Sequence, residues 1–150
     1  LLDEMYVEAI ADGSHLPAEL LQLIYKVKGP RRVCLVTDSM CAAGMPDGEY
    51  SLGGVPCIKE NGVAKLMDRS AFAGSVATTD MLVRTFCNLT GAPLYDVVRM
   101  TSLTPAEMLG IGTRTGSIQV GKAADLLVFD EDVQLKHIVV AGRTEFSTLQ

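Results

Sequence analysis

The sequence contains no apolar run that approaches the roughly 20 residues needed to span a bilayer. It also has no stripe of lysine and arginine, and its net charge is −5, so it lacks the basic surface that phosphate backbones require. The first residues, Leu1 to Glu4, have neither the basic nor the apolar region of a secretory signal peptide. We therefore expect no membrane and no nucleic acid as partner, and a cytoplasmic location.

Cysteine patterns and nucleotide-binding motifs are missing as well. Cys34, Cys41, Cys57 and Cys87 are irregularly spaced, which fits neither a zinc-binding Cys-x-x-Cys pair nor a dense disulfide framework. We interpret all four as reduced thiols. The chain has no glycine-rich dinucleotide fingerprint, no P-loop and no Gly-x-Ser-x-Gly nucleophile elbow. These absences disfavour nucleotide binding and a serine nucleophile.

The composition is that of a globular chain, with 48% hydrophobic and 21% charged residues. Its first part predicts a βαβ unit. Residues 6–11 predict a strand that ends at a turn, residues from Pro17 to Gly29 have apolar side chains at helical spacing, and residues 32–37 form a nearly continuous apolar run. Such a run is typical of a strand buried on both faces.

The residue pattern changes twice in the remainder of the chain. Residues 42–68 are punctuated by glycine and predict a long loop followed by hairpin strands. Apolar spacing then predicts helices at 78–89 and 94–100, with a short helix at 105–109. Beyond Gly116 we expect strands at 117–118, 125–129 and 133–140, in a separate small sheet.

Asp38 is the most informative position, because it follows the apparently buried strand directly. In β/α barrels the catalytic groups lie at the carboxyl ends of the strands. One interpretation is a general base near a substrate or metal, and the other is an ordinary turn or helix-capping aspartate. The residues alone leave both open.

Two further places could contribute to a site. His15 follows Asp12-Gly13-Ser14 at the end of the preceding strand and would share a rim with Asp38 if the strands are parallel, although a solvated loop histidine is the alternative. The run from Ala73 to Ser75 precedes a predicted helix, and its glycine could allow close backbone approach to a ligand. A plain loop with Ser75 or Thr78 as helix cap is the alternative there. His137 lies in a predicted strand without acidic or histidine neighbours, and we expect it to be structural.

Several stretches, in matching order and spacing, resemble the N-acetylglucosamine-6-phosphate deacetylases of the amidohydrolase superfamily. The specific ones are Ile10-Ala11-Asp12-Gly13-Ser14-His15, Leu35-Val36-Thr37-Asp38, Ala43-Gly44-Met45-Pro46-Asp47-Gly48-Glu49-Tyr50 and Phe72-Ala73-Gly74-Ser75. The downstream Thr104-Pro105-Ala106 and the run from Gly116 to Leu126 are similar to a more general amidohydrolase ending.

The resemblance implies an α/β fold: the C-terminal portion of a TIM-like (β/α)8 barrel in residues 1–112 and part of a small β-sandwich domain in residues 113–150. It implies that Asp38 ends the eighth strand as general base and acid. It also implies substrate contacts from two segments, which are Asp12, Gly13, Ser14 and His15 after the seventh strand, and Phe72, Ala73 and Gly74 through their backbone.

The implied reaction is hydrolysis of N-acetylglucosamine 6-phosphate to glucosamine 6-phosphate and acetate by a metal-dependent hydrolase of amino-sugar metabolism, a homodimer at full length. The family's divalent metal, usually zinc, has no matching ligands in this chain, and they are expected upstream. The chain opens without an initiator methionine inside a predicted element, so we expect a fragment that is inactive alone. Ser14 and Ser39 replace a larger apolar residue and an alanine, which leaves substrate details open.

Two rival hypotheses remain. The chain could come from another amidohydrolase, such as a dihydroorotase-like or cyclic-imide hydrolase, which Asp12-Gly13-Ser14-His15 and Pro46-Asp47-Gly48 argue against. It could also be a non-catalytic interaction module, for which replacing Asp38 would have no effect.

Overall fold

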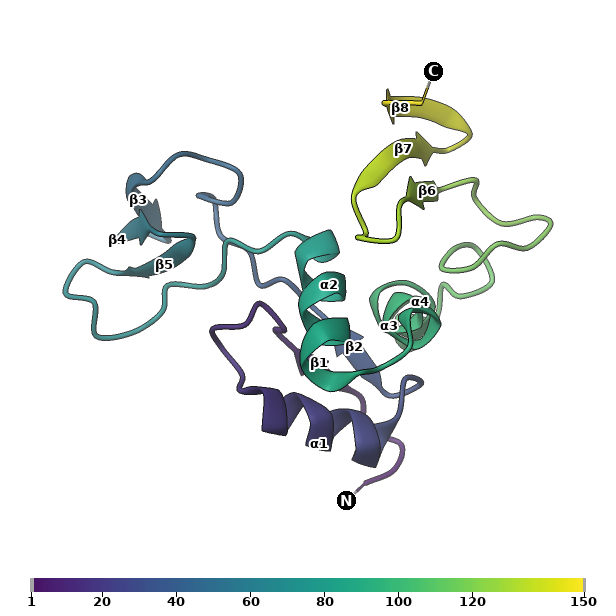
Figure 1. The fold of residues 1–150 in the computed structure, drawn as a ribbon, viewed down its shortest axis with the longest axis horizontal. Coiled ribbons are helices and arrows are strands. Elements are labelled where there is room, and N and C mark those ends of the chain that lie inside the picture. The colour runs from purple at the N-terminus through teal and green to yellow at the C-terminus, as the bar shows by residue number, and fades with distance from the viewer. Residues whose placement is uncertain (1, 150) are drawn as a thin grey trace.

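Residues 2–149 are described by a computed structural model (Figure 1). The first part is one βαβ unit, formed by β1 (Val7–Ala9), α1 (Ala18–Lys28) and β2 (Val33–Leu35). Strands β1 and β2 are parallel, with Val7 opposite Val33. Helix α1 begins after the extended Pro17 and ends at Gly29, whose φ is +67° and whose N–H donates to the Tyr25 carbonyl. The predicted unit is confirmed, with strands shorter than expected.

Three helices cover this unit. They are α2 (Thr79–Thr90), α3 (Leu94–Thr101) and α4 (Leu103–Met108), close to the ranges expected from apolar spacing. Leu21 of α1, Val33 of β2, Phe86 of α2 and Val97 of α3 are all fully buried in one cluster, and Tyr25 packs edge-on against Phe86. The apolar faces of the helices thus meet at the strands. This core holds β1 and β2 in place, and with them their carboxyl ends.

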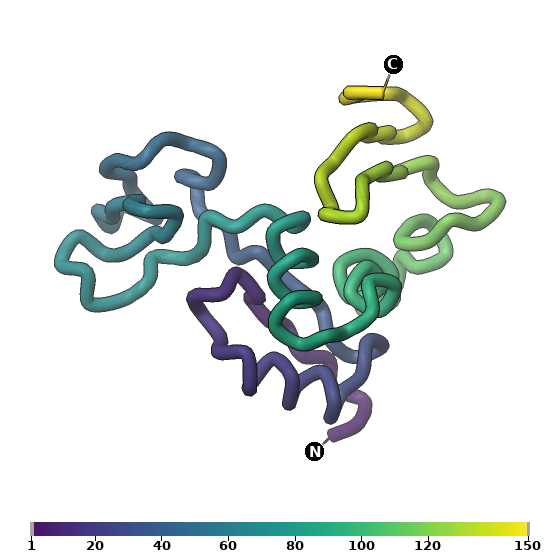
Figure 2. Tube along the Cα trace, in the orientation of Figure 1, coloured from purple at the N-terminus to yellow at the C-terminus, as the bar shows by residue number. Residues whose placement is uncertain are grey.

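The glycine-rich middle of the chain forms a separate arm, which lies to the left of the helices in Figures 1 and 2. Its antiparallel strands β3 (Gly48–Leu52), β4 (Val55–Glu60) and β5 (Val63–Leu66) are joined by turns at Gly53-Gly54 and Asn61-Gly62. A second small core lies beneath them, with Cys57, Ala64 and Ala73 buried. The expected hairpin strands are confirmed.

The last strands form the expected small sheet, at the upper right of Figure 1. It contains β6 (Leu126–Phe129), β7 (Leu135–Val140) and β8 (Arg143–Ser147), all antiparallel. It contacts the main core through Val133, which is 7% exposed, and through the partly buried Phe129 of β6. The carbonyl of Val133 accepts a hydrogen bond from the Arg84 side chain of α2 at 2.9 Å. The apolar contacts of Val133 and Phe129 and the Arg84 hydrogen bond therefore hold the sheet against the helices.

Two details of the predicted elements were wrong. Residues 117–118 are not a strand but part of a loop, because the Lys122 ammonium gathers this loop by donating to the carbonyls of Gly112 and Thr115 and to the Ser117 hydroxyl. Strand β8 was not predicted at all, although the Ala141-Gly142 turn, with both φ angles positive, is a hairpin signal. Within residues 2–149 no helix is long and apolar enough to cross a membrane.

Candidate functional site

The parallel pairing of β1 and β2 brings their carboxyl ends to one edge. The backbone N–H of Val36 donates to the carbonyl of Ala9 at 3.0 Å, which continues the pairing just beyond the strands. The loop from Asp12 to His15 leaves β1 there, and Asp38 follows β2. The His15 loop and Asp38, which the sequence predicted at a common rim, therefore lie at the same end of the two parallel strands.

Asp38 has a strained backbone and an unengaged carboxylate. Its φ is +47°, a left-handed conformation that is uncommon for a residue other than glycine, and such conformations cluster at functional sites. Its side chain is solvent-exposed and makes no hydrogen bond to any atom of residues 2–149. The turn or cap role that the sequence left open is therefore not used by this carboxylate within the described chain.

The segment Phe72 to Ser75 is fastened beside Asp38 by the backbone. The Ser75 N–H donates to the Asp38 carbonyl at 2.9 Å, and the Met40 N–H donates to the Ser75 carbonyl at 2.9 Å. Gly74 has φ +73°, and a Cβ placed on it would lie 3.1 Å from the Asp38 carbonyl oxygen. The glycine is thus needed for close approach to Asp38, so this segment determines where Asp38 is held.

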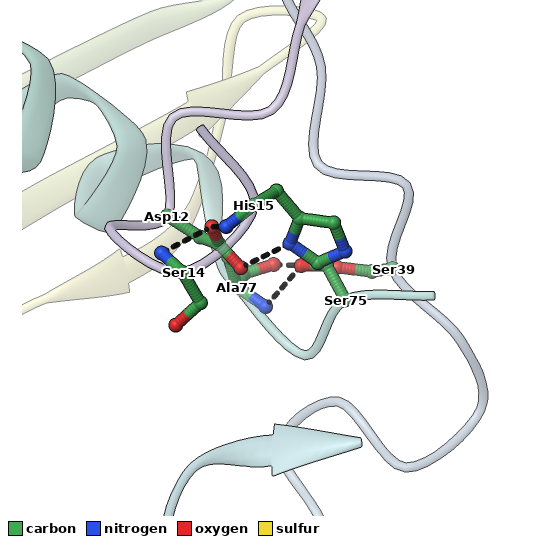
Figure 3. A network of polar contacts seen from close by, with 6 residues as sticks. All are labelled: Asp12, Ser14, His15, Ser39, Ser75 and Ala77. Atoms are coloured by element: carbon green, nitrogen blue, oxygen red, sulfur yellow. Dashed lines mark hydrogen bonds and ion pairs between the residues drawn. The ribbon is translucent and has the colours of Figure 1, made fainter. Parts of the chain in front are cut away.

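Asp12 and His15 form a compact polar pair (Figure 3). One oxygen of Asp12 accepts the backbone N–H groups of Ser14 and His15, both at 2.9 Å, and the other lies 2.8 Å from His15 Nδ1. The two side chains are only 10% and 16% exposed. Gly13, with φ +84°, allows the tight loop that brings His15 back onto Asp12.

The pKa of Asp12 is set by opposing effects. Burial alone would raise it, but the backbone N–H groups of His15 and Ser14, together with the His15 ring, outweigh burial and hold the pKa below its ordinary value of 3.8. Asp12 is therefore a carboxylate at neutral pH, and it can only accept hydrogen bonds.

Phe72 reaches His15 from a distant part of the chain. The two rings lie 4.6 Å apart between centroids and are inclined by 35°. The family resemblance implies a substrate contact through the backbone of Phe72, and the structure adds that its ring packs against His15. The other ring nitrogen of His15, Nε2, makes no hydrogen bond within residues 2–149.

Ser14 and Ser39, the two serines that differ from the pattern of the family that this sequence resembles, have different surroundings. Ser39 donates its hydroxyl hydrogen bond to the Ala77 carbonyl at 2.5 Å, and Ala77 in turn donates its N–H to Ser75 Oγ at 2.8 Å (Figure 3). The Ser39 hydroxyl thus ties the end of β2 to the loop before α2. Ser14 is exposed. Helix α2 is capped at Thr78 without a side-chain hydrogen bond.

A metal does not fit the described residues by themselves. Residues 2–149 contain no group of three or more histidine, cysteine, aspartate or glutamate side chains that could hold one. His137 lies in a strand, β7, as predicted, and its Nε2 is 3.4 Å from the Thr144 hydroxyl.

Comparison with known proteins gives one consistent family. Residues 5–145 match the amidohydrolase family. The chain is 34% identical over 149 residues to an N-acetylglucosamine-6-phosphate deacetylase of Lysinibacillus sphaericus, covering 99% of this chain and 38% of that protein. It is 37% identical over 139 residues to a putative N-acetylgalactosamine-6-phosphate deacetylase of Escherichia coli K12, covering 92% of this chain and 81% of that protein.

A solved structure agrees with these relatives. The N-acetylglucosamine-6-phosphate deacetylase of Thermotoga maritima superimposes with a TM-score of 0.91 at 35% identity, covering 99% of this chain and 40% of that one. The chain therefore spans about two fifths of the length of the Lysinibacillus and Thermotoga proteins.

Proposed function

This chain belongs to the amidohydrolase family, and from that membership we propose that it is the C-terminal part of an amino-sugar-phosphate deacetylase and carries its catalytic aspartate, Asp38. The Asp38 carboxylate takes the proton from the water that attacks the acetamide carbonyl. It then gives that proton to the nitrogen of the departing amine, so that acetate and the free amino sugar are the products.

The observation that carries this proposal is the state of Asp38. Its carboxylate is exposed at the carboxyl end of a strand, is free of partners within residues 2–149, and is held on a backbone with φ +47°. The Gly74 segment fastens that backbone from the other side. An exposed carboxylate without a partner, on a backbone held in place by the Gly74 segment, suits a group that exchanges a proton with a bound reactant.

The preferred substrate is N-acetylglucosamine 6-phosphate, in line with the names of the Lysinibacillus and Thermotoga proteins. We propose that the segment from Asp12 to His15 contacts this substrate, together with the backbone of Phe72 to Gly74. N-acetylgalactosamine 6-phosphate is the second candidate, because the Escherichia coli relative of which this chain covers 81% carries that name. The two sugars differ in the orientation of one hydroxyl group.

Enzymes of this family generally depend on a metal, and a divalent ion of the zinc type would polarise the acetamide carbonyl and activate the water. The described residues do not form its ligand set, so in this proposal the ligands come from outside this chain.

The wider architecture also belongs to the proposal. We propose that residues 1–112 complete a TIM-like barrel and that residues 113–150 contribute to a small β-sandwich domain, which is consistent with the separate sheets β1–β2 and β6–β8. A cytoplasmic homodimer is the expected form of the whole enzyme, and light scattering of the purified complete gene product measures that state.

The test is turnover by the complete gene product. Acetate release is measured with N-acetylglucosamine 6-phosphate and N-acetylgalactosamine 6-phosphate, side by side and with the unphosphorylated sugars as controls. We expect kcat/KM to be highest for N-acetylglucosamine 6-phosphate. Preference for the galactosamine compound would move the assignment to the second candidate, and failure to release acetate from any of the four sugars would refute the proposed function.

A further inference from the structure

Two contacts determine the orientation of the His15 imidazole ring, one at its Nδ1 edge and one from the Phe72 ring. The Asp12 carboxylate lies 2.8 Å from Nδ1, and the Phe72 ring packs against the imidazole at 4.6 Å. Asp12 itself is anchored by two backbone N–H groups, at 2.9 Å each. The carboxylate therefore cannot turn away from His15 without losing those bonds.

The chemistry of the contact also determines the proton position on the ring. A carboxylate has no hydrogen to donate, so the nitrogen that faces it must carry the shared proton. His15 is therefore the Nδ1–H tautomer when neutral, which leaves Nε2 as the ring atom with no partner in residues 2–149. When Nε2 is protonated as well, the same carboxylate still accepts the hydrogen bond from Nδ1–H.

We propose that Asp12 is a positioning residue: it fixes the tautomer and the orientation of His15, so that Nε2 is the atom that meets the substrate. This inference rests on the proposed function, and it reassigns Asp12 from the expected substrate contact to a residue that acts through His15. The ring of Phe72, which belongs to the other predicted substrate-binding segment, packs against the same imidazole.

The experiment replaces Asp12 with asparagine in the complete gene product. Asparagine keeps the shape and the carbonyl oxygen that accepts the backbone N–H groups, but it presents an NH₂ group to Nδ1 and so favours the opposite tautomer. We expect kcat/KM for the amino-sugar phosphate to fall about tenfold or more, the loss associated with a hydrogen bond to a charged group. Most of this loss should appear in KM, because Asp38 and its surroundings are unchanged.

Asp68→Asn is the matched control. Asp68 also accepts the backbone N–H of a residue two positions later, Ser70, at 3.0 Å, but it lies on the β3–β5 arm and pairs with no histidine. This control makes the same chemical change in a similar turn, and kinetics should remain those of the wild type.

A double-mutant cycle separates positioning from a structural role. In a His15→Ala background, Asp12→Asn should have no further effect on kcat/KM, because there is no ring left to position. An equal loss in both backgrounds would mean that Asp12 only supports the loop, and no loss in the wild-type background would also overturn the proposal.

Nitrogen NMR of histidine-labelled protein reads the tautomer without using activity. His15 is identified by the signal lost in His15→Ala, and we expect Nδ1–H in the wild type and Nε2–H in Asp12→Asn. If the wild type deacetylates nothing, the proposed function fails while this spectrum still tests the pair. An Nε2–H tautomer in the wild type would overturn the inference, even if Asp12→Asn does not fold.

Discussion

Gly74→Ala tests how strongly the Phe72 to Ser75 segment controls Asp38. Gly74 has φ +73°, a conformation that costs a residue with a Cβ about 1 to 2 kcal/mol. The new Cβ would also lie 3.1 Å from the Asp38 carbonyl oxygen. Because that neighbour is backbone and not a flexible side chain, the end of β2 must shift by a few tenths of an ångström, at a further cost of about 1 kcal/mol.

Gly62→Ala provides the matched comparison. Gly62 has φ +76°, nearly the same conformation, but a Cβ there would meet nothing within 4 Å. Both variants should be destabilised by the cost of a left-handed alanine. Only Gly74→Ala should be destabilised further by the contact with the Asp38 carbonyl oxygen. Urea unfolding of the complete gene product would then show a loss of about 2 to 3 kcal/mol for Gly74→Ala and about 1 to 2 kcal/mol for Gly62→Ala.

Activity separates the two variants further. A displaced Asp38 reaches the reacting atoms less well, so Gly74→Ala should lower kcat about tenfold, whereas Gly62→Ala should leave kcat unchanged. If both variants lose the same free energy of unfolding and keep wild-type kcat, then Gly74 does not hold Asp38 and the reasoning is refuted.

Three further predictions concern stability. Arg84→Ala removes the hydrogen bond to the Val133 carbonyl and should cost about 1 kcal/mol; amide exchange should become faster in β6–β8 but not in β1–β2. Phe86→Ala empties the fully buried centre of the core and should lower the unfolding free energy by about 3 to 5 kcal/mol, measured by urea titration. Because the pKa of Asp12 is lowered on folding, its carboxylate contributes stability above pH 3.8 that is lost as the pH falls through the lower folded value. Asp12→Asn should therefore flatten that acid loss, and an unchanged pH dependence between pH 6 and pH 2 would contradict the lowered pKa.

Local patterns predicted most of the fold because each rests on short-range physics. Apolar spacing identified α1, α2 and α3, and the uninterrupted run before Asp38 identified β2, since a strand buried on both faces has no polar side to display. Strand β8 was missed because its five residues are all exposed and show little hydrophobic pattern. Residues 117–118 were misjudged because the Lys122 ammonium, which no local propensity reports, organises that loop.

The candidate site was predictable by position but not by geometry. The ends of two parallel strands placed Asp38 and the His15 loop at one edge, and the structure confirms the parallel pairing. The Asp12–His15 contact was within reach of the sequence, because residues three apart around a glycine can fold back on each other. The packing of Phe72 on His15 joins residues that are remote in the chain, and only the tertiary structure reveals it.

The most direct test of the account is kcat of Asp38→Asn in the complete gene product, measured with N-acetylglucosamine 6-phosphate at saturating concentration. Asparagine keeps the size of the side chain and tolerates the left-handed backbone, but it cannot take a proton from water. We predict that kcat falls by about 10²- to 10⁴-fold, the range for loss of a general acid–base group, with an unchanged free energy of unfolding. A kcat within about threefold of the wild type would be less than one such group supplies, and it would show that Asp38 is not the catalytic aspartate.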